Sequence, residues 1–236
     1  MDIALTLNGQ ARTLSCPAGQ RLSDVLREVA GARDVKVGCD AGDCGACTVL
    51  LNGDAVCACL TTAAQADGAE ITTAKGLTDA AGTGLRAAFH RHGAAQCGIC
   101  TPGMMIAARA LIERHAAPNR SQIEEALGGV LCRCTGYAKI IDAVADYAGT
   151  GAPTSPASGA AVGARIQRLD GAAKVNGEEV FGADYWPEQA LVVRAVRAPH
   201  HRAAFAFGDL KRWKQETPGV VAVFTAADIP GRNAFG

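Results

Sequence analysis

Residues 2–16, DIALTLNGQARTLSC, alternate apolar and polar positions on both sides of an Asn8-Gly9 pair. Alternation with a period of two is typical of half-buried strands, and Asn-Gly between two such runs indicates a β-hairpin. Residues 48–60, TVLLNGDAVCACL, repeat the pattern, and residues 69–77, AEITTAKGL, predict a further strand. Ser23 is a suitable N-cap for a helix between the hairpins. We therefore expect residues 1–77 to form a small mixed sheet with one helix.

The periodicity becomes helical over residues 82–148. Thr101 followed by Pro102 is typical of a helix start, with threonine as the N-cap and proline in the first turn. Ser121 and Glu124 have the spacing of a capping box. A last helix is predicted over residues 138–148, AKIIDAVADYA. The sequence thus predicts a second, helical domain over residues 78–148.

Residues 149–164 have a different composition, GTGAPTSPASGAAVGA, which holds no charge and a single Val. Such a segment is too poor in bulky apolar groups to fold by itself, so it predicts a linker. Residues 165–236 are expected to form a further domain, with a short helix at residues 209–216. Its expected strands have the sequences ALVVRAVRAP, AAFAFG and VVAVFTA.

The overall composition is that of a soluble globular protein, with 49% hydrophobic residues, 23 basic residues and 23 acidic residues. Only 5% of residues are aromatic, and no Lys/Arg run exceeds two residues, which argues against a nucleic-acid surface. No apolar run reaches the roughly 18 residues of a membrane helix. The amino terminus lacks the pattern of a secretory signal, so we expect a cytoplasmic protein. Its ten cysteines therefore point to metal binding ahead of disulfides.

The first group of cysteines has the spacing C-x4-C-x2-C, formed by Cys39, Cys44 and Cys47, and Cys59 follows after a strand, a turn and a strand. Plant-type ferredoxins hold a [2Fe-2S] cluster with this spacing, whereas zinc usually takes two C-x2-C hooks. Three glycines in this stretch let the backbone wrap closely enough to donate N–H groups to cluster sulfurs. These glycines are Gly38, Gly42 and Gly45. A structural zinc loop is the alternative.

The second group of cysteines is ambiguous by spacing alone, because two short hooks can also bind zinc. Its members are Cys97, Cys100, Cys132 and Cys134. Both hooks precede expected helix starts, where free N–H groups favour an anionic thiolate cluster. Cys16 and Cys57 are interpreted as packing residues, because buried free thiols are common. None of the five histidines lies at ligand spacing from a cysteine, and we take all five as surface or packing residues. They are His90, His92, His115, His200 and His201.

The order GCDAGDCGACTV, a later Cys59, QCGICTPGMM and CRCTGY resembles the iron–sulfur part of the molybdenum hydroxylases, the xanthine oxidase and aldehyde oxidoreductase family. The resemblance covers residues 1–148 and implies an α+β protein: a plant-ferredoxin-like β-grasp domain followed by a four-helix [2Fe-2S] bundle. It implies that the first cysteine group ligates one [2Fe-2S] cluster and the second cysteine group ligates another. The cluster of the second group would be the one nearer molybdenum. By the same resemblance Gln96 and Cys134 contact the molybdopterin cofactor.

The tail is similar to the start of the family's large molybdopterin-binding subunit, the a/b hammerhead region, on the residues RLDGAAKVNGEEVFGAD, VRAVRAPHHRAA and TPGVVAVFTAADIPGRN. The resemblance implies an electron-transfer component of a molybdenum hydroxylase that acts on an aldehyde or an N-heteroaromatic ring. No residue of this chain matches the family's catalytic glutamate, so no catalytic residue is expected here. We expect the tail, which stops at Gly236, to be completed by a large molybdopterin-binding partner chain.

The terminal electron acceptor is expected to lie outside this chain, because the sequence has no G-x-G-x-x-G loop and a flavin such as FAD must then reside on another subunit. Two other classes of protein are alternatives: a free-standing ferredoxin-like carrier and a zinc-stabilised interaction module. The hammerhead-like tail argues against the first of these. A visible spectrum excludes or supports the second, since zinc is colourless.

Overall fold

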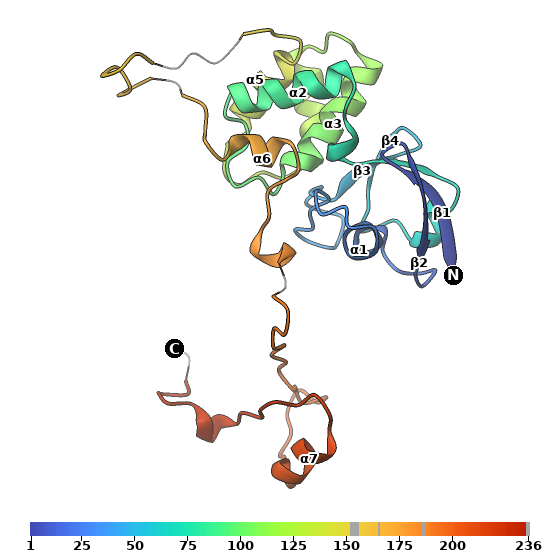
Figure 1. Ribbon diagram of the computed structural model, residues 1–236, viewed down its shortest axis with the longest axis vertical. Helices are drawn as coiled ribbons and strands as arrows, with labels where there is room; N and C mark the ends of the chain where they lie inside the picture. Colours follow the sequence, from blue (N-terminus) through green and yellow to red (C-terminus); the bar gives the residue numbers. More distant parts are fainter. Residues whose placement is uncertain (152–155, 165, 186, 235–236) are drawn as a thin grey trace. The chain divides into compact units, whose positions relative to one another are not determined.

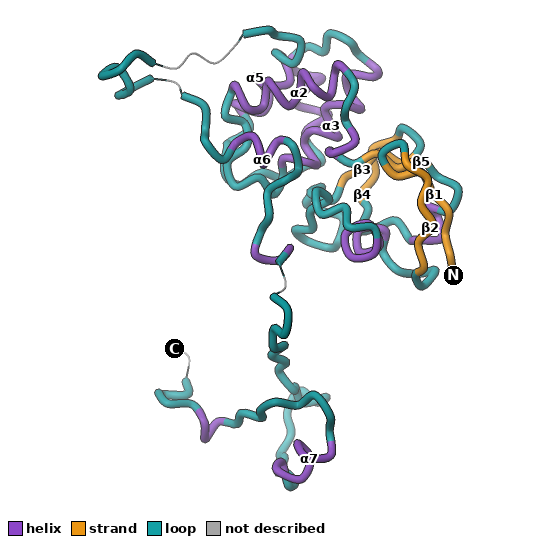
Figure 2. The backbone as a smooth tube through the Cα atoms, viewed as in Figure 1, coloured by secondary structure: helices purple, strands orange, loops and turns teal. Residues whose placement is uncertain are grey.

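The computed structural model describes residues 1–151, 156–164, 166–185 and 187–234. The chain divides into two compact units, Met1–Trp186 and Pro187–Gly236. The first unit has two hydrophobic cores, one beneath a β-sheet and one among helices. We call residues 1–77 the sheet region and residues 78–148 the helical region. The combination of one sheet with several helices confirms the predicted α+β class (Figure 2).

Two hairpins and one short strand form the sheet (Figure 1). Its order is β2-β1-β5-β3-β4, with β1 and β5 parallel and the other neighbours antiparallel. Both Asn-Gly turns have positive φ, 51° and 79° at Asn8 and Gly9, and 51° and 91° at Asn52 and Gly53, as a two-residue hairpin turn requires. The predicted hairpins are thus confirmed. The strands are β1 (Asp2–Leu7), β2 (Gln10–Ser15), β3 (Thr48–Leu51), β4 (Asp54–Cys57) and β5 (Glu70–Thr72).

One helical segment packs on the sheet, α1 (Leu22–Asp24), which continues as a π-helical turn at Val25–Val29. Leu22, Val25 and Leu26 are fully buried in the core of the sheet region. Short 3-10 turns lie at Ala63–Ala66 and Ala74–Gly76. Residues 30–37 connect the end of the π-helical turn to the cysteine-rich loop at residues 38–47.

Four helices build the helical region around Phe89, Met104 and Ile140, which are completely buried. The most deeply buried of these helices is the one that begins at Thr101, since its residues 101–108 are all buried. The helix predicted over residues 138–148 is confirmed over most of its length. The helices are α2 (Ala80–Arg91), α3 (Thr101–Arg114), α4 (Arg120–Leu127) and α5 (Ala138–Ala145).

The predicted helix caps are wrong by one or two residues. Cys100, not Thr101, is the N-cap of α3. The capping box of α4 joins Asn119 to Gln122, because the N-cap lies two residues before the predicted Ser121. Ser23 caps nothing: its hydroxyl is buried without a hydrogen-bond partner, and Arg21 is the N-cap of α1.

Residues 166–185 belong to the first unit, although the sequence grouped them with the tail. They carry α6 (Gly171–Val175) and a 3-10 turn at Gly182–Asp184. Val175 is part of the core of the helical region. The predicted linker lies partly outside the described residues, and its described parts, residues 149–151 and 156–164, form no helix or strand. The predicted domain limits and the linker remain predictions.

The second unit contains the predicted helix, α7 (Leu210–Glu216), and a 3-10 turn at Ala226–Asp228. The three strands predicted in the tail are wrong: residues 187–234, all described, form no strand. Val193 and Val196 are 91% and 97% exposed. A strand is stabilised by its neighbours, and here no second strand pairs with these apolar runs.

No helix in the described part of the chain has the length and apolar character needed to cross a membrane. The cytoplasmic location stays a prediction.

Candidate metal centres

The first cysteine loop, residues 38–47, aims backbone N–H groups at a sulfur. The Sγ atom of Cys39 accepts hydrogen bonds from the backbone N–H of Ala41 at 3.4 Å and of Cys44 at 3.3 Å. These two hydrogen bonds, that from Ala41 first, lower the pKa of Cys39 to about 7. Hydrogen bonds to a charged form stabilise it, so this loop favours a thiolate, the form that ligates metal.

Glycine is required at two positions in this loop. Gly42 and Gly45 have positive φ, 84° and 65°. A Cβ atom at Gly38 would approach the Sγ atom of Cys44 to 3.0 Å, and one at Gly42 would overlap the side chain of Leu60. The loop is therefore wound too tightly for other side chains, as a backbone that surrounds a cluster must be.

Cys47 and Cys59 complete the first group from the sheet. Both are buried, Cys47 just before β3 and Cys59 just after β4. Burial raises the pKa of Cys47 to about 12, and Cys59 is close enough to contribute through a side-chain hydrogen bond. Cys59 therefore lies beside Cys47, and a metal ion would be needed to keep the buried Cys47 thiol deprotonated.

Cys57 packs against the core of the sheet region, as predicted, and also contacts the first cysteine loop. Its thiol donates to the carbonyl oxygen of Gly42 at 3.9 Å, and burial raises its pKa, with further contributions that include Cys59 and Cys44. The backbone pairs Cys57 with Thr48, the residue after Cys47. Cys16, in contrast, is buried in the core of the sheet region.

The second group of cysteines meets in pairs. Burial raises the pKa of Cys100, and Cys132 contributes next, while a side-chain hydrogen bond with Cys97 is the main cause that raises the pKa of Cys134. Cys100 is buried and Cys132 half-buried, whereas Cys97 and Cys134 are exposed. The structure thus places Cys100 near Cys132 and Cys97 near Cys134. Gln96, half-buried, precedes the exposed Cys97.

Two residues that the sequence reading did not single out hold the Cys132 hook. The Sγ atom of Cys132 accepts from the backbone N–H of Thr135 at 3.4 Å and lies 3.1 Å from the Thr135 hydroxyl. Burial raises the pKa of Cys132, but the hydrogen bonds, chiefly those from Thr135, outweigh it and lower the pKa. The Tyr137 hydroxyl accepts from the backbone N–H of Cys132 at 2.9 Å. Their presence within CRCTGY was the available signal.

The two cysteine groups are joined by a backbone hydrogen bond. The N–H of Leu131, which precedes Cys132, donates to the carbonyl oxygen of Cys44 at 2.9 Å. Gly45 packs so closely on Gly129 and Val130 that a Cβ atom at Gly45 would overlap the Gly129 carbonyl oxygen. The first cysteine loop is therefore in direct contact with residues 129–131, which lead into the CRC hook of Cys132 and Cys134.

The described residues contain no group of three or more Cys, His, Asp or Glu side chains placed to hold a single metal ion. His92 lies 2.8 Å from an Asp146 oxygen and His90 lies 3.2 Å from the Arg168 carbonyl oxygen, in keeping with their surface or packing roles.

Two family descriptions match the chain. The 2Fe-2S iron-sulfur cluster binding domain matches residues 5–78, and the [2Fe-2S] binding domain matches residues 73–145. These matches cover both cysteine groups. Two domains that bind [2Fe-2S] clusters are therefore present in residues 5–145.

Curated and solved relatives agree with this assignment. The nicotine 6-hydroxylase small subunit of Paenarthrobacter nicotinovorans is 46% identical over 149 residues, 63% of this chain and 90% of that protein. The aldehyde oxidoreductase of Megalodesulfovibrio gigas is 38% identical over 97% of this chain, which spans only 27% of that protein. The crystal structure of the aldehyde oxidoreductase from Desulfovibrio desulfuricans superposes with a TM-score of 0.73 and 40% identity, over 78% of this chain and 22% of that one. The chain therefore belongs to the family of iron–sulfur components of the molybdenum hydroxylases.

Proposed function

We propose that this chain passes electrons singly from a molybdopterin centre on a partner chain, through two [2Fe-2S] sites, to a flavin or another acceptor. The observation that carries the proposal is a pair of cysteine groups, each with a backbone donor on a sulfur, whose neighbouring backbones are joined by the hydrogen bond from Leu131 to Cys44. When bound, [2Fe-2S] clusters supply one-electron redox chemistry. This chain contributes the positions of the ligands and the polarity around them.

The ligand assignments follow from the two groups of thiols. We assign one site to Cys39, Cys44, Cys47 and Cys59, and the other to Cys97, Cys100, Cys132 and Cys134. Hydrogen bonds to cluster sulfurs and solvent exposure tune the potential of such sites. The Ala41 and Cys44 amides act on the first site, and Thr135 acts on the second. The lowered pKa values of Cys39 and Cys132 support an anionic group at both.

The contact between the sites supplies a route for electrons. From Cys44, a covalent path runs to its own carbonyl oxygen, across one hydrogen bond to the Leu131 amide, and on to Cys132. We propose that this path connects the two sites. A side chain at Gly45 would overlap the Gly129 carbonyl oxygen. This supports the proposal that the backbone of the first loop must stay close to the backbone of residues 129–131.

The exposed side of the second group is the proposed molybdopterin contact. Cys97 and Cys134 are exposed and Gln96 is half-buried beside them. A glutamine amide both donates and accepts hydrogen bonds, which suits a pterin edge. We propose that Gln96 and Cys134 contact the cofactor of a large molybdopterin-binding partner chain. FAD, where it is used, would lie on another subunit, and no residue of this chain is proposed as catalytic.

The tail supports the same partner. The similarity of this chain to an aldehyde oxidoreductase covers 97% of the chain and therefore includes the tail. Several large apolar side chains of the tail are exposed, among them Val193, Phe205 and Phe224. We propose that residues 165–236 begin the molybdopterin-binding hammerhead domain and are completed by the partner chain. Residues 1–77 and 78–148 would then be the β-grasp and four-helix domains. The substrate class is an aldehyde or an N-heteroaromatic ring.

Co-expression with the molybdopterin-binding chain tests this proposal. By itself, the reduced chain is expected to pass electrons to ferricyanide but to oxidise no aldehyde or N-heterocycle, because it carries no catalytic residue. Co-purification followed by mass spectrometry should identify the partner, and substrate oxidation should appear only with both chains. A monomer that oxidises substrate alone, or whose tail resists proteolysis as strongly as the sheet region, would contradict the proposal.

A further inference from the structure

We infer that residues 166–185, which we call the strap, brace the sheet region against the helical region and hold the Cys97–Cys100 hook in place, with Asp184 as their anchor. The strap contains α6 and the 3-10 turn at Gly182–Asp184. It follows the linker and passes along both regions of the first unit (Figure 1). The inferred effect on the hook rests on the proposed function, whereas the brace itself does not.

The strap packs closely against the helical region through Val175, Gly171 and the Arg168 carbonyl oxygen. Val175 is buried in the core of the helical region, next to the buried Lys174. Gly171 lies so close to His90 that a Cβ atom would come within 2.7 Å of the imidazole Cδ2 atom. The imidazole Nε2 atom is 3.2 Å from the Arg168 carbonyl oxygen. The strap is therefore part of the packing of this region.

The strap also covers the glycine in the middle of the hook. Gly98 lies between Cys97 and Cys100 and has a φ of 92°. A Cβ atom there would be 3.0 Å from the Lys174 Cγ atom and 3.3 Å from the Phe181 Cζ atom. The alkyl chain of Lys174 and the ring of Phe181 thus pack against Gly98, which is buried.

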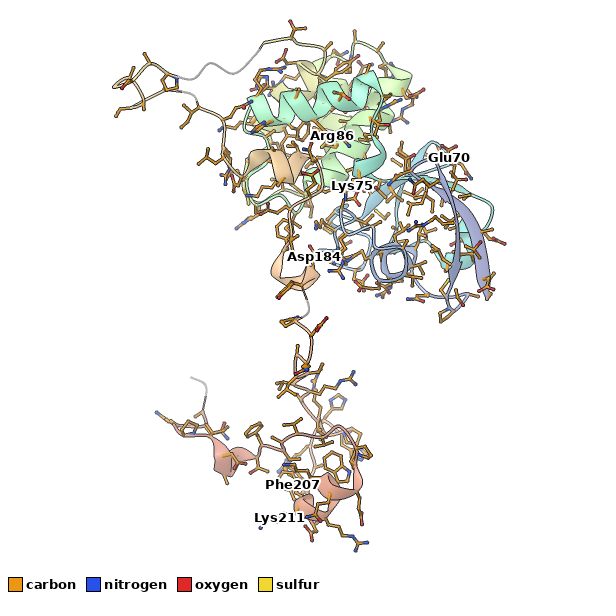
Figure 3. The ribbon with its side chains drawn as sticks, in the orientation of Figure 1. Glu70, Lys75, Arg86, Asp184, Phe207 and Lys211 are labelled. Carbon is orange, nitrogen blue, oxygen red and sulfur yellow. The ribbon has the colours of Figure 1, made fainter. Side chains whose placement is uncertain are left out.

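On the sheet region, the strap ends in a buried ion pair. Asp184 is 5% exposed, and its two carboxylate oxygens lie 2.7 Å from the Arg27 guanidinium and 3.0 Å from the Lys36 ammonium. Figure 3 labels Asp184 at the turn that ends the strap. Its second oxygen also accepts from the backbone N–H of Phe181 at 3.1 Å. The Lys36 ammonium lies 4.5 Å from the centre of the Phe181 ring. Gly177 adds a contact with Asp34.

Removing the Asp184 charge would leave Lys36, among the described residues, with no acidic partner at a buried site, and would leave Arg27 with only the exposed Glu28, 3.8 Å away. Breaking one side of a buried ion pair destabilises strongly, because the remaining charge is desolvated and uncompensated. Lys36 is also only three residues before Cys39, so the anchor reaches the start of the first cysteine loop. Asp184 is therefore a positioning residue, which acts on the second cysteine group through the strap and on the first through Lys36.

Hydrogen exchange of the full-length Asp184→Asn chain tests the inference. We expect peptides of residues 166–185 to exchange roughly tenfold faster or more, since their anchor is lost. Peptides of β1 and β5 should exchange as in the unchanged chain. Glu188→Gln, which removes one exposed carboxylate beyond the strap, should leave the strap protected, and Asp184→Glu, which keeps the charge, should restore much of the protection.

A strap that exchanges within about twofold of the unchanged chain after Asp184→Asn would overturn the brace, because twofold is only a few tenths of a kcal/mol. The effect on the hook is read separately, from a potentiometric titration of the two cluster signals: the potential of the second site should shift and that of the first should shift less. Equal potentials in both chains would overturn the effect on the hook. A chain that binds no clusters would contradict the proposed function, while hydrogen exchange would still decide on the brace.

Discussion

The Cys44→Ser chain is expected to lose about half of its iron, from about four atoms to about two, and one of two cluster signals in electron paramagnetic resonance. Cys44 lies in the first cysteine loop, and its backbone N–H also donates to Cys39. Its carbonyl oxygen accepts from Leu131, so the variant keeps the contact between the two cysteine groups. The second group should therefore retain its iron. Iron analysis and spectra of the reduced chain measure both effects.

Cys57→Ser and Cys16→Ser are the matched controls, because each removes one thiol outside the two proposed ligand sets. Both variants should retain both signals and their iron. Cys57 is the more demanding control, since its thiol contacts Gly42 inside the first loop. Loss of the first signal in Cys57→Ser, with retention in Cys59→Ser, would show that the fourth ligand has been assigned to the wrong cysteine.

The Gly45→Ala chain is expected to be less stable by about 2–5 kcal/mol. The left-handed backbone at this position, with a φ of 65°, disfavours any side chain by about 1–2 kcal/mol. Overlap of the new methyl group with the Gly129 carbonyl adds about 1–3 kcal/mol, because two backbones must separate. Urea unfolding with both sites loaded measures the loss. The separation should also weaken the hydrogen bond from Leu131 to Cys44.

Gly53→Ala separates these two causes. Gly53 also has positive φ, 91°, but a Cβ atom there meets nothing within 4 Å. It should be less stable by only about 1–2 kcal/mol, with unchanged transfer of electrons between the sites. Equal losses of stability in the two variants would contradict the claim that Gly45 is needed for contact between the first loop and the CRC hook.

The parts of the fold that depend on local sequence were predictable. The Asn8-Gly9 and Asn52-Gly53 turns carry their own backbone preference, and the predicted hairpins form around them. Helix caps were misplaced because several neighbouring polar residues can cap: Asn119 takes the place expected for Ser121. The apolar runs in the tail are typical of strands, but a strand also needs a neighbouring strand to pair with. The pattern of residues along the tail does not report whether such a neighbour is present.

The candidate sites were predictable where short spacings define them, as in the groups around Cys44 and Cys132. The strap was not, because its anchor joins Asp184 to Arg27 and Lys36, which are 157 and 148 residues away in the sequence. No spacing or periodicity reports such a pairing. Thr135 and Tyr137 were within the quoted motif, but their hydrogen bonds to Cys132 form in a turn that ends with positive φ at Gly136 and Tyr137, a conformation that the motif letters do not specify.

The central claim is that this one chain holds two [2Fe-2S] sites in two separate cysteine groups. Iron and acid-labile sulfide analysis of the purified full-length chain, combined with paramagnetic resonance of its reduced form, tests it most directly. The account predicts a red-brown protein with about four iron atoms per chain and two distinct signals of equal intensity. About two iron atoms with a single signal, or a colourless protein with stoichiometric zinc, would contradict it.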